Sequence, residues 1–117
     1  EKIEKVNELI NKHEQEIANP LLEYINSRDD IKLIGKNKIE NKNRAPTIAF
    51  TMDNKSSKEL SSDLVKHGIA TRNDNFYAWR CLKALGIDVD DGVVRTSMVH
   101  YNTHEDVDNL INALKKI

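Results

Sequence analysis

The chain has 117 residues, 38% of them hydrophobic and 32% charged, so it is long enough for one domain with a single core. Its 18 basic and 19 acidic residues leave a net charge of −1, which argues against a general nucleic-acid binder. No apolar run approaches the roughly 18 residues of a membrane span, and a signal-peptide pattern is absent from this sequence.

The sequence has a single cysteine, Cys81, which excludes an internal disulfide and suits a reducing compartment. We therefore expect a cytoplasmic protein. The sequence opens on Glu1, already inside a helical pattern, rather than on a methionine. We expect it to be a piece of a longer protein.

Apolar residues between Ile3 and Ile25 recur mostly at helical spacing and predict a leading helix over residues 1–27. Pro20 falls inside this pattern. Because proline lacks an N–H donor and crowds the preceding turn, we expect it to kink or divide the helix near Asn19.

Two strands are predicted next. Residues 31–34 form a short apolar run, and residues 47–52 (TIAFTM) are rich in residue types that favour strands, so the second should lie centrally in a sheet. The charged segment 35–43 between them is predicted to be a loop or a hairpin connection.

Ser56 and Glu59 have the spacing of a capping box, which predicts a helix from there to about His67. Gly68 then supplies a helix stop. Residues 69–71 are predicted to form a third strand.

The remaining elements are short. Residues 73–75 (NDN) predict a turn, residues 77–85 a short helix and residues 93–99 a fourth strand. Thr103 with Asp106 resembles a second capping box and predicts the last helix.

This order of elements, α-β-β-α-β-α-β-α, predicts an α+β fold in which helices cover one face of a small, mostly antiparallel sheet. We expect a single domain over residues 1–117, with a leading helix over residues 1–27 and an α+β core over residues 31–117.

The predicted fourth strand carries a charged residue, Arg95, between valines and a methionine. A charge in such a strand costs several kcal/mol unless it is paired or opens into a cleft. The residues alone leave two interpretations open. Arg95 could form an ion pair with a nearby acid, or it could bind a carboxylate or phosphate through two parallel hydrogen bonds. The planar guanidinium of arginine suits such a contact better than the ammonium of lysine does.

Two further arginines lie near predicted strands. Arg72 opens the polar turn, so it could converge on the same cleft as Arg95, although an arginine at a strand end is usually solvated. Arg44 precedes the central strand, and we expect it to form an ion pair at a rim or between domains.

His100 and His104 have a spacing that would suit zinc on one helix. Here the pair straddles a strand end and a helix start, without a cysteine or a third histidine beside it. We predict no metal site.

The short helix carries Cys81 with no histidine base in its local sequence, so a packed thiol is favoured over a nucleophile. The aromatic residues Phe76, Tyr77 and Trp79 are expected to anchor this helix. Tyr77 could instead point at a ligand, because it directly follows the polar turn.

Two motifs stand out in the second half of the chain: GIxxR at residues 68–72 and VRxSxxxYNT at residues 94–103. With them, residues 44–117 resemble the C-terminal domain of a class V aminotransferase-like enzyme of the cysteine desulfurase type. The segments RAPTIAF, DNFYA and VHYNT are similar to a subgroup known only as cysteine desulfurase-like.

The resemblance implies the small C-terminal domain of a pyridoxal-phosphate-dependent transferase of fold type I that acts on an amino acid. In this superfamily the large domain holds the Schiff-base lysine, the acid that pairs with the pyridine nitrogen and the histidine stacked on the cofactor. None of those motifs occurs in this sequence. We therefore expect the chain's own large domain as its partner, a homodimer at full length, and no cofactor binding or catalysis by this domain alone.

The resemblance also implies residue roles. Arg95 takes the role of the arginine that binds the substrate carboxylate, and Arg72 a supporting one. The place of the desulfurase nucleophile falls at Tyr77, while Cys81 lies one helical turn beyond it, which argues against persulfide formation. We expect Tyr77 and Asn75 of this loop to contact the substrate, and the domain to close over the active site as a lid.

Two other functions were considered. A free-standing α+β module could use Arg95 to sense a small carboxylate, or bind another protein, without catalysis. Nucleic acid could contact a basic run, but Glu40 and the overall charge oppose that hypothesis. The run consists of Lys36, Lys38, Lys42 and Arg44.

Overall fold

The computed structural model describes residues 1–40 and 44–117. Its elements are, in order, α1 (Lys2–Asn26), β1 (Ile31–Ile34), β2 (Thr47–Met52), α2 (Ser57–Lys66), β3 (Arg72–Asp74), α3 (Trp79–Ala84), β4 (Val93–Ser97) and α4 (His104–Leu114). The predicted order of elements is confirmed. Lys42 and the end of the predicted 35–43 loop lie outside the described residues.

The four strands form one sheet in the order β1-β2-β4-β3, with every pair antiparallel. β2 is an inner strand, as predicted. Because side chains alternate along a strand, Ile48, Phe50 and Met52 point to the buried face, and Val94 of β4 lies opposite Phe50 on that same face. The other face carries Arg95 and its neighbours.

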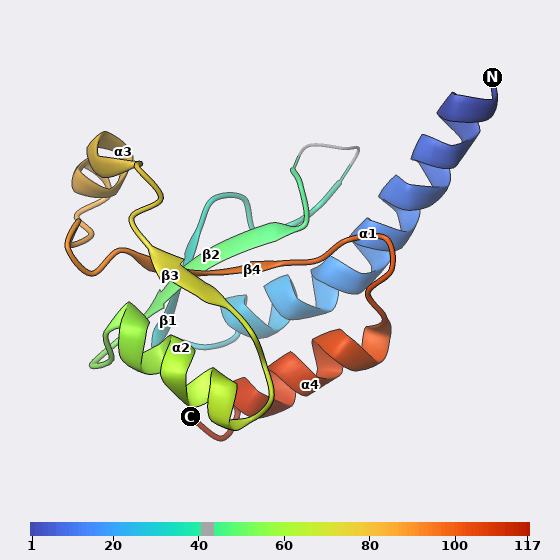
Figure 1. Ribbon diagram of the computed structural model, residues 1–117. Coiled ribbons are helices and arrows are strands. Elements are labelled where there is room, and N and C mark those ends of the chain that lie inside the picture. The colour runs from blue at the N-terminus through green and yellow to red at the C-terminus, as the bar shows by residue number, and fades with distance from the viewer. Residues whose placement is uncertain (41–43) are drawn as a thin grey trace.

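Figure 1 shows the helices α1, α2 and α4 gathered on one side of the sheet, with α3 beyond its end. The α+β fold with helices on one face is therefore confirmed. The core lies between these three helices and the sheet, where large side chains are removed from water and supply the main stabilising term. Its fully buried members include Ile17, Leu21, Leu22, Ile25, Ile48, Phe50, Leu60, Leu64, Val94 and Leu114.

α1 runs unbroken from Lys2 to Asn26, so Pro20 does not divide it. Pro20 is exposed, as is Glu16 four residues earlier, whose carbonyl loses its helical donor and can turn to water. The buried Ile17 and Leu21 hold this part of the helix against the core. The N-terminal half extends away from the rest of the molecule (Figure 1).

The two predicted capping boxes are both present. Ser56 accepts a hydrogen bond from the backbone of Glu59, whose side chain accepts one in return, and Thr103 and Asp106 do the same at α4. The Thr103 backbone N–H holds the pKa of the Asp106 carboxyl below its usual value. No helix in the described part of the chain has the length and apolar character needed to cross a membrane.

The third strand lies later than predicted. Ile69 lies just beyond α2 and closes its C-terminal end, because its backbone N–H donates to the Leu64 carbonyl at 3.0 Å. The strand instead spans Arg72–Asp74, where the backbone pairs with β4. Asn73 and Asp74 are therefore strand residues, and the predicted turn begins only at Asn75. The short helix α3 begins at Trp79, two residues later than predicted.

Candidate functional site

The pairing of β3 with β4 places Arg72 directly opposite Arg95. Ala49 of β2 is the partner of Arg95 on its other side, so both arginines stand on the sheet face away from the core. Arg95 is half-buried and Arg72 is exposed. The structure thus brings together the two arginines that the sequence singled out.

Neither arginine is paired with an acid in the described part of the chain. Among the described residues, no carboxylate forms an ion pair with Arg72 or Arg95. Asp74, the acid nearest to Arg72 in the strand, accepts a hydrogen bond from the Asn75 backbone N–H at 2.7 Å. The ion-pair interpretation of Arg95 is therefore wrong for this part of the chain.

Arg95 lies over the ring of Phe76 instead. The central guanidinium carbon is 3.9 Å from the ring centroid, which is the geometry of a cation–π contact. A ring brings no carboxylate oxygen, so the charge of the guanidinium stays unneutralised by Phe76. The guanidinium N–H groups of Arg95 donate no hydrogen bond to any other described residue, so they remain available to a ligand.

The segment 75–77 turns sharply between β3 and α3. Phe76 and Tyr77 both have positive φ angles, 51° and 60°, which are uncommon for residues with side chains. The Asn75 side chain holds this turn: its Oδ1 accepts from the Tyr77 N–H at 3.0 Å, and its Nδ2 donates to the Val89 carbonyl at 3.2 Å. Each end of the Asn75 amide thus has one bond within the protein.

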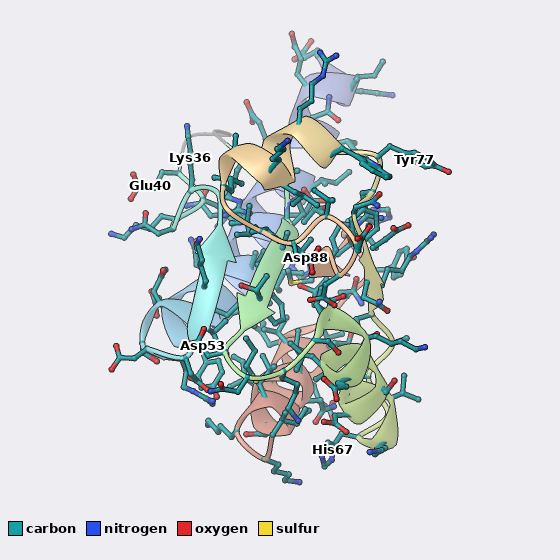
Figure 2. The ribbon with its side chains drawn as sticks, turned by 90° about the vertical axis from the view of Figure 1, so that its left-hand side faces the viewer. Lys36, Glu40, Asp53, His67, Tyr77 and Asp88 are labelled. Carbon is teal, nitrogen blue, oxygen red and sulfur yellow. The ribbon has the colours of Figure 1, made fainter. Side chains whose placement is uncertain are left out.

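Tyr77 points outward from this turn. Its side chain is 95% exposed, and Figure 2 shows it extending away from the body of the molecule. Trp79 is 55% exposed, so the expectation that these two aromatics anchor α3 is wrong. The consecutive positive φ angles direct Tyr77 outward, and Leu82 is the buried residue of α3.

The backbone of Gly92, just before β4, lies close to the backbone of β3 where the turn begins. Gly92, with φ of 76°, lies so near β3 that a Cβ added to it would come within 2.3 Å of the Asp74 carbonyl group. The preceding residue, Asp91, accepts bonds from the Ser57 backbone N–H at 2.9 and 3.1 Å. The connection between α3 and β4 is thereby tied both to β3 and to the start of α2.

Cys81 is exposed, so the prediction of a packed thiol is wrong. The described residues contain no cluster of three or more potential ligands for a metal ion, and His100 packs edge-on against Tyr101 rather than joining His104. Arg44 donates to the backbone carbonyls of Lys36 and Thr47 rather than to an acid among the described residues.

A pocket of about 260 Å³ opens between the ends of β4 and α2 and the start of α4. It has no arginine or lysine in its lining, so it offers no cation to an anionic ligand. Its lining residues are Gly68, Ile69, Ala70, Thr71, Thr96, Ser97, Met98, Asn102, Asp106, Val107, Asn109 and Leu110. The arginine face of the sheet is the better candidate site.

The sequence did not predict the contact between Phe76 and Arg95. The two residues are 19 positions apart, and the contact depends on the register of β3 on β4 and on the positive φ of Phe76. A polar turn followed by an aromatic residue was the one available signal.

Residues 3–110 match the family model of aminotransferase class-V. An aminotransferase-like protein of Gibberella zeae is 38% identical over 111 residues, which cover 92% of this chain and 27% of that protein. A cysteine desulfurase of Escherichia coli O8 is 30% identical over 108 residues, with 92% and 25% covered. The chain spans about a quarter of the length of these curated relatives.

Solved structures show the same fold. The apo cysteine desulfurase of Thermococcus onnurineus matches with a TM-score of 0.82 at 23% identity, over 98% of this chain and 28% of that one. The cysteine desulfurase CsdA of Escherichia coli matches with a TM-score of 0.75 at 24% identity, and the match covers 91% of this chain and 24% of that one. At these identities the likeness concerns the fold.

Proposed function

Because the chain belongs to the class V aminotransferase family, we propose that it is the small domain of a pyridoxal-phosphate-dependent enzyme acting on an amino acid. In this proposal Arg95 binds the substrate carboxylate, Arg72 supports it, and the turn with Asn75 and Tyr77 closes over the active site as a lid. Such a role suits a chain that spans about a quarter of its relatives' length.

The observation that carries the proposal is the cross-strand pair of Arg72 and Arg95, neither of which forms an ion pair with a described acid. Like charges directly opposite each other destabilise a sheet, so such a pair is unfavourable until an anion arrives. A carboxylate accepts two parallel hydrogen bonds from a guanidinium, and such bonds are among the stronger ones in proteins. An amino acid offers that carboxylate.

We infer that the cofactor site lies outside this domain. Pyridoxal phosphate needs a lysine for its aldehyde and donors for its phosphate, and when bound it supplies an electron sink. Lys32 is the one lysine in the four strands, but β2 separates its strand from β4, and its ammonium donates to the Leu85 carbonyl at 3.3 Å. We propose that a larger domain holds the cofactor and that this chain contacts the substrate.

The turn residues have different roles in this proposal. Asn75 has one amide proton and one oxygen lone pair left after its two bonds in the turn, and these could reach the substrate. Tyr77 has its whole ring free to cover a bound molecule. We propose that Tyr77 acts by closing the pocket rather than by reacting.

The test uses the full-length protein that contains this domain, loaded with pyridoxal phosphate and titrated with amino acids while the cofactor absorbance is followed. Arg95→Lys should weaken amino-acid binding by roughly 1.5–3 kcal/mol, because an ammonium cannot make the two-point contact. The cofactor absorbance without substrate should stay nearly unchanged. Arg44→Lys is the matched control, since Arg44 bonds to backbone carbonyls elsewhere. Unaltered affinity in Arg95→Lys would overturn the assignment.

A second experiment addresses the cofactor. The 117-residue chain, incubated with pyridoxal phosphate and dialysed, should retain no absorbing aldimine. Retention of one equivalent on a specific lysine would contradict the division of labour between the two domains.

A further inference from the structure

Arg95 is held in place by an aromatic ring, which is an unusual partner for a half-buried arginine in a strand. The guanidinium carbon is 3.9 Å from the Phe76 centroid, and no carboxylate of the described residues pairs with it. An acid at this place would also fix the side chain, but it would cancel the charge and occupy the N–H groups. A ring fixes the guanidinium and leaves both charge and N–H edge available.

Phe76 is itself held firmly by its surroundings. Its positive φ is an uncommon backbone state that persists only where neighbouring contacts impose it. Asn75 bonds to both sides of the turn, the Ala78 N–H closes it on the Asn75 carbonyl at 2.9 Å, and Gly92 abuts Asp74. The ring is therefore presented to Arg95 by a rigid turn.

Phe76 does not serve the main core. It is half-buried and absent from the cluster of buried side chains that the three larger helices form with the sheet. Its Arg95 contact is the ring contact that the structure records for it. Packing in the core therefore does not account for the placement of the Phe76 ring against Arg95.

We propose that Phe76 is a positioning residue for substrate binding: its ring orients the Arg95 guanidinium so that the N–H edge meets the substrate carboxylate. This inference rests on the proposed function of Arg95. It adds that affinity depends on the electrostatic face of the ring at position 76, and not only on the presence of an apolar side chain there.

The test measures L-alanine binding to the full-length protein by the change in cofactor absorbance, because the alanine methyl adds no other polar group to recognise. Phe76→Leu should weaken binding about three- to tenfold, the range expected from losing one cation–π contact. Phe76→Tyr should stay within about twofold of the unmodified protein, since it keeps the ring. Trp79→Leu is the matched control, because it removes an exposed aromatic of α3 that makes no cation–π contact with Arg95.

A second variant guards against misfolding. Pentafluorophenylalanine at position 76 keeps the ring shape but reverses the charge distribution of its face, so it should weaken binding like leucine does. In an Arg95→Ala background, Phe76→Leu should change the affinity by less than about twofold, because no guanidinium remains to be oriented.

A readout independent of activity is the proton shift of the Arg95 Nε–H group in labelled protein. The ring should displace it in the unmodified protein, and Phe76→Leu should abolish the displacement. Unmodified affinity in the pentafluoro variant, or an equal effect of Phe76→Leu with and without Arg95, would overturn the positioning role. If Arg95→Lys itself leaves amino-acid binding unchanged, or if none of the amino acids, L-alanine included, gives a response, the proposed function fails instead.

Discussion

Arg72 and Arg95 are directly opposed residues of β3 and β4, and they share one face of the sheet without an acid between them. Two positive charges therefore lie near the β3 edge of the sheet, on the face that points away from the core. Like charges in directly opposed positions destabilise a sheet. In the proposed function a bound carboxylate would offset this repulsion, so we expect ligand binding to stabilise the domain.

The first prediction concerns that repulsion. Arg72→Thr should raise the free energy of unfolding by about 0.2–1 kcal/mol at low salt, since it removes a like charge opposite Arg95 and adds a residue that favours strands. The gain should shrink as salt screens the pair. Chemical denaturation at two ionic strengths measures both effects.

The control for this prediction is Lys32→Thr. Lys32 also occupies an exposed strand position, but its cross-strand partner is Thr51, so no charge repulsion is lost. A salt-dependent gain of the same size in Lys32→Thr would show that the effect is general and not due to the arginine pair.

The second prediction concerns the close approach of Gly92 to Asp74. Gly92→Ala should destabilise the domain through its positive φ, which costs about 1–2 kcal/mol, and through a backbone clash that adds about 1–3 kcal/mol. Gly86→Ala is the matched control, because Gly86 has φ of 71° but nothing within 4 Å of an added Cβ. Thermal unfolding measures the stability of both variants. Equal losses of stability would mean that the backbone of β3 moves away from the added Cβ without destabilising the domain.

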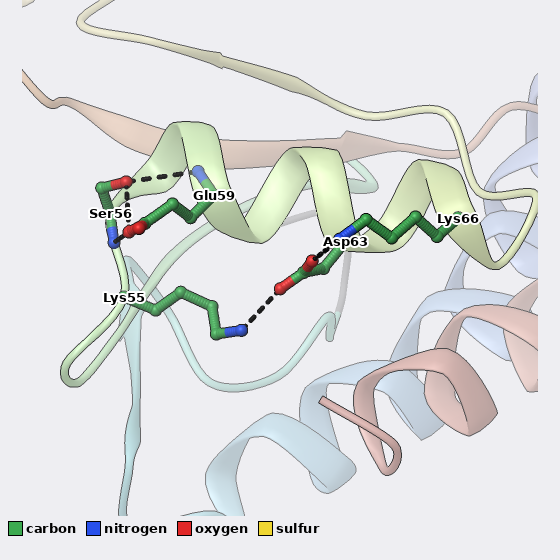
Figure 3. A network of polar contacts seen from close by, with 5 residues as sticks. All are labelled: Lys55, Ser56, Glu59, Asp63 and Lys66. Atoms are coloured by element: carbon green, nitrogen blue, oxygen red, sulfur yellow. Dashed lines mark hydrogen bonds and ion pairs between the residues drawn. The ribbon is translucent and has the colours of Figure 1, made fainter.

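The third prediction concerns acid stability. Figure 3 shows Asp63 of α2 between Lys55, at 2.5 Å, and Lys66, at 2.8 Å. These ammonium groups lower the pKa of Asp63 from 3.8 to about 2. Because the folded-state pKa lies below the unfolded one, the stabilisation is complete above pH 3.8 and is lost as the pH falls through about 2.

Asp63→Asn should therefore lower stability at neutral pH and flatten the loss of stability between about pH 4 and 2. The measurement is the denaturation midpoint as a function of pH. Asp108→Asn, at an exposed acid of α4, is the control and should leave that slope unchanged. If stability falls with pH as steeply in Asp63→Asn as in the unmodified protein, the ion pairs of Asp63 do not cause the acid loss of stability.

The element order and the fold class could be predicted from the sequence because their signals are local. Capping boxes at Ser56 and Thr103 act within four residues, and the apolar period of α1 and the β-rich run of β2 act within single elements. The position of β3 could not be predicted this way. Arg72, Asn73 and Asp74 are polar, and they form a strand only because β4 supplies backbone partners.

The site was predicted in part for the same reason. Arg95 stood out as a charge within an apolar strand, whereas its contact with Phe76 depends on a backbone state that residues other than glycine rarely adopt. The exposure of Cys81 was missed because α3 is short and buries only Leu82, so helical position alone did not tell which side faces water.

The last prediction concerns sulfur chemistry. By resemblance, Tyr77 stands where desulfurases place a thiolate, and a phenol with a reference pKa near 10 is a poor sulfur acceptor. Cys81 is exposed, but it lies within α3, beyond the turn that carries Tyr77. A thiol in another element, four residues further along the chain, does not take the place of a side chain in the turn, because a nucleophile must approach the atom that it attacks within about 3.5 Å.

We therefore expect the full-length protein not to carry a persulfide on this domain. The experiment incubates it with L-cysteine and pyridoxal phosphate and then determines the mass of the Cys81 peptide under non-reducing conditions. That peptide should gain no sulfur atom, and Cys81→Ser should leave any turnover of L-cysteine unchanged. Tyr77→Cys is the informative companion variant, because it restores a thiol at the position of the turn. Sulfur at Cys81, with turnover lost in Cys81→Ser, would show that α3 moves and that the exposed thiol is the acceptor.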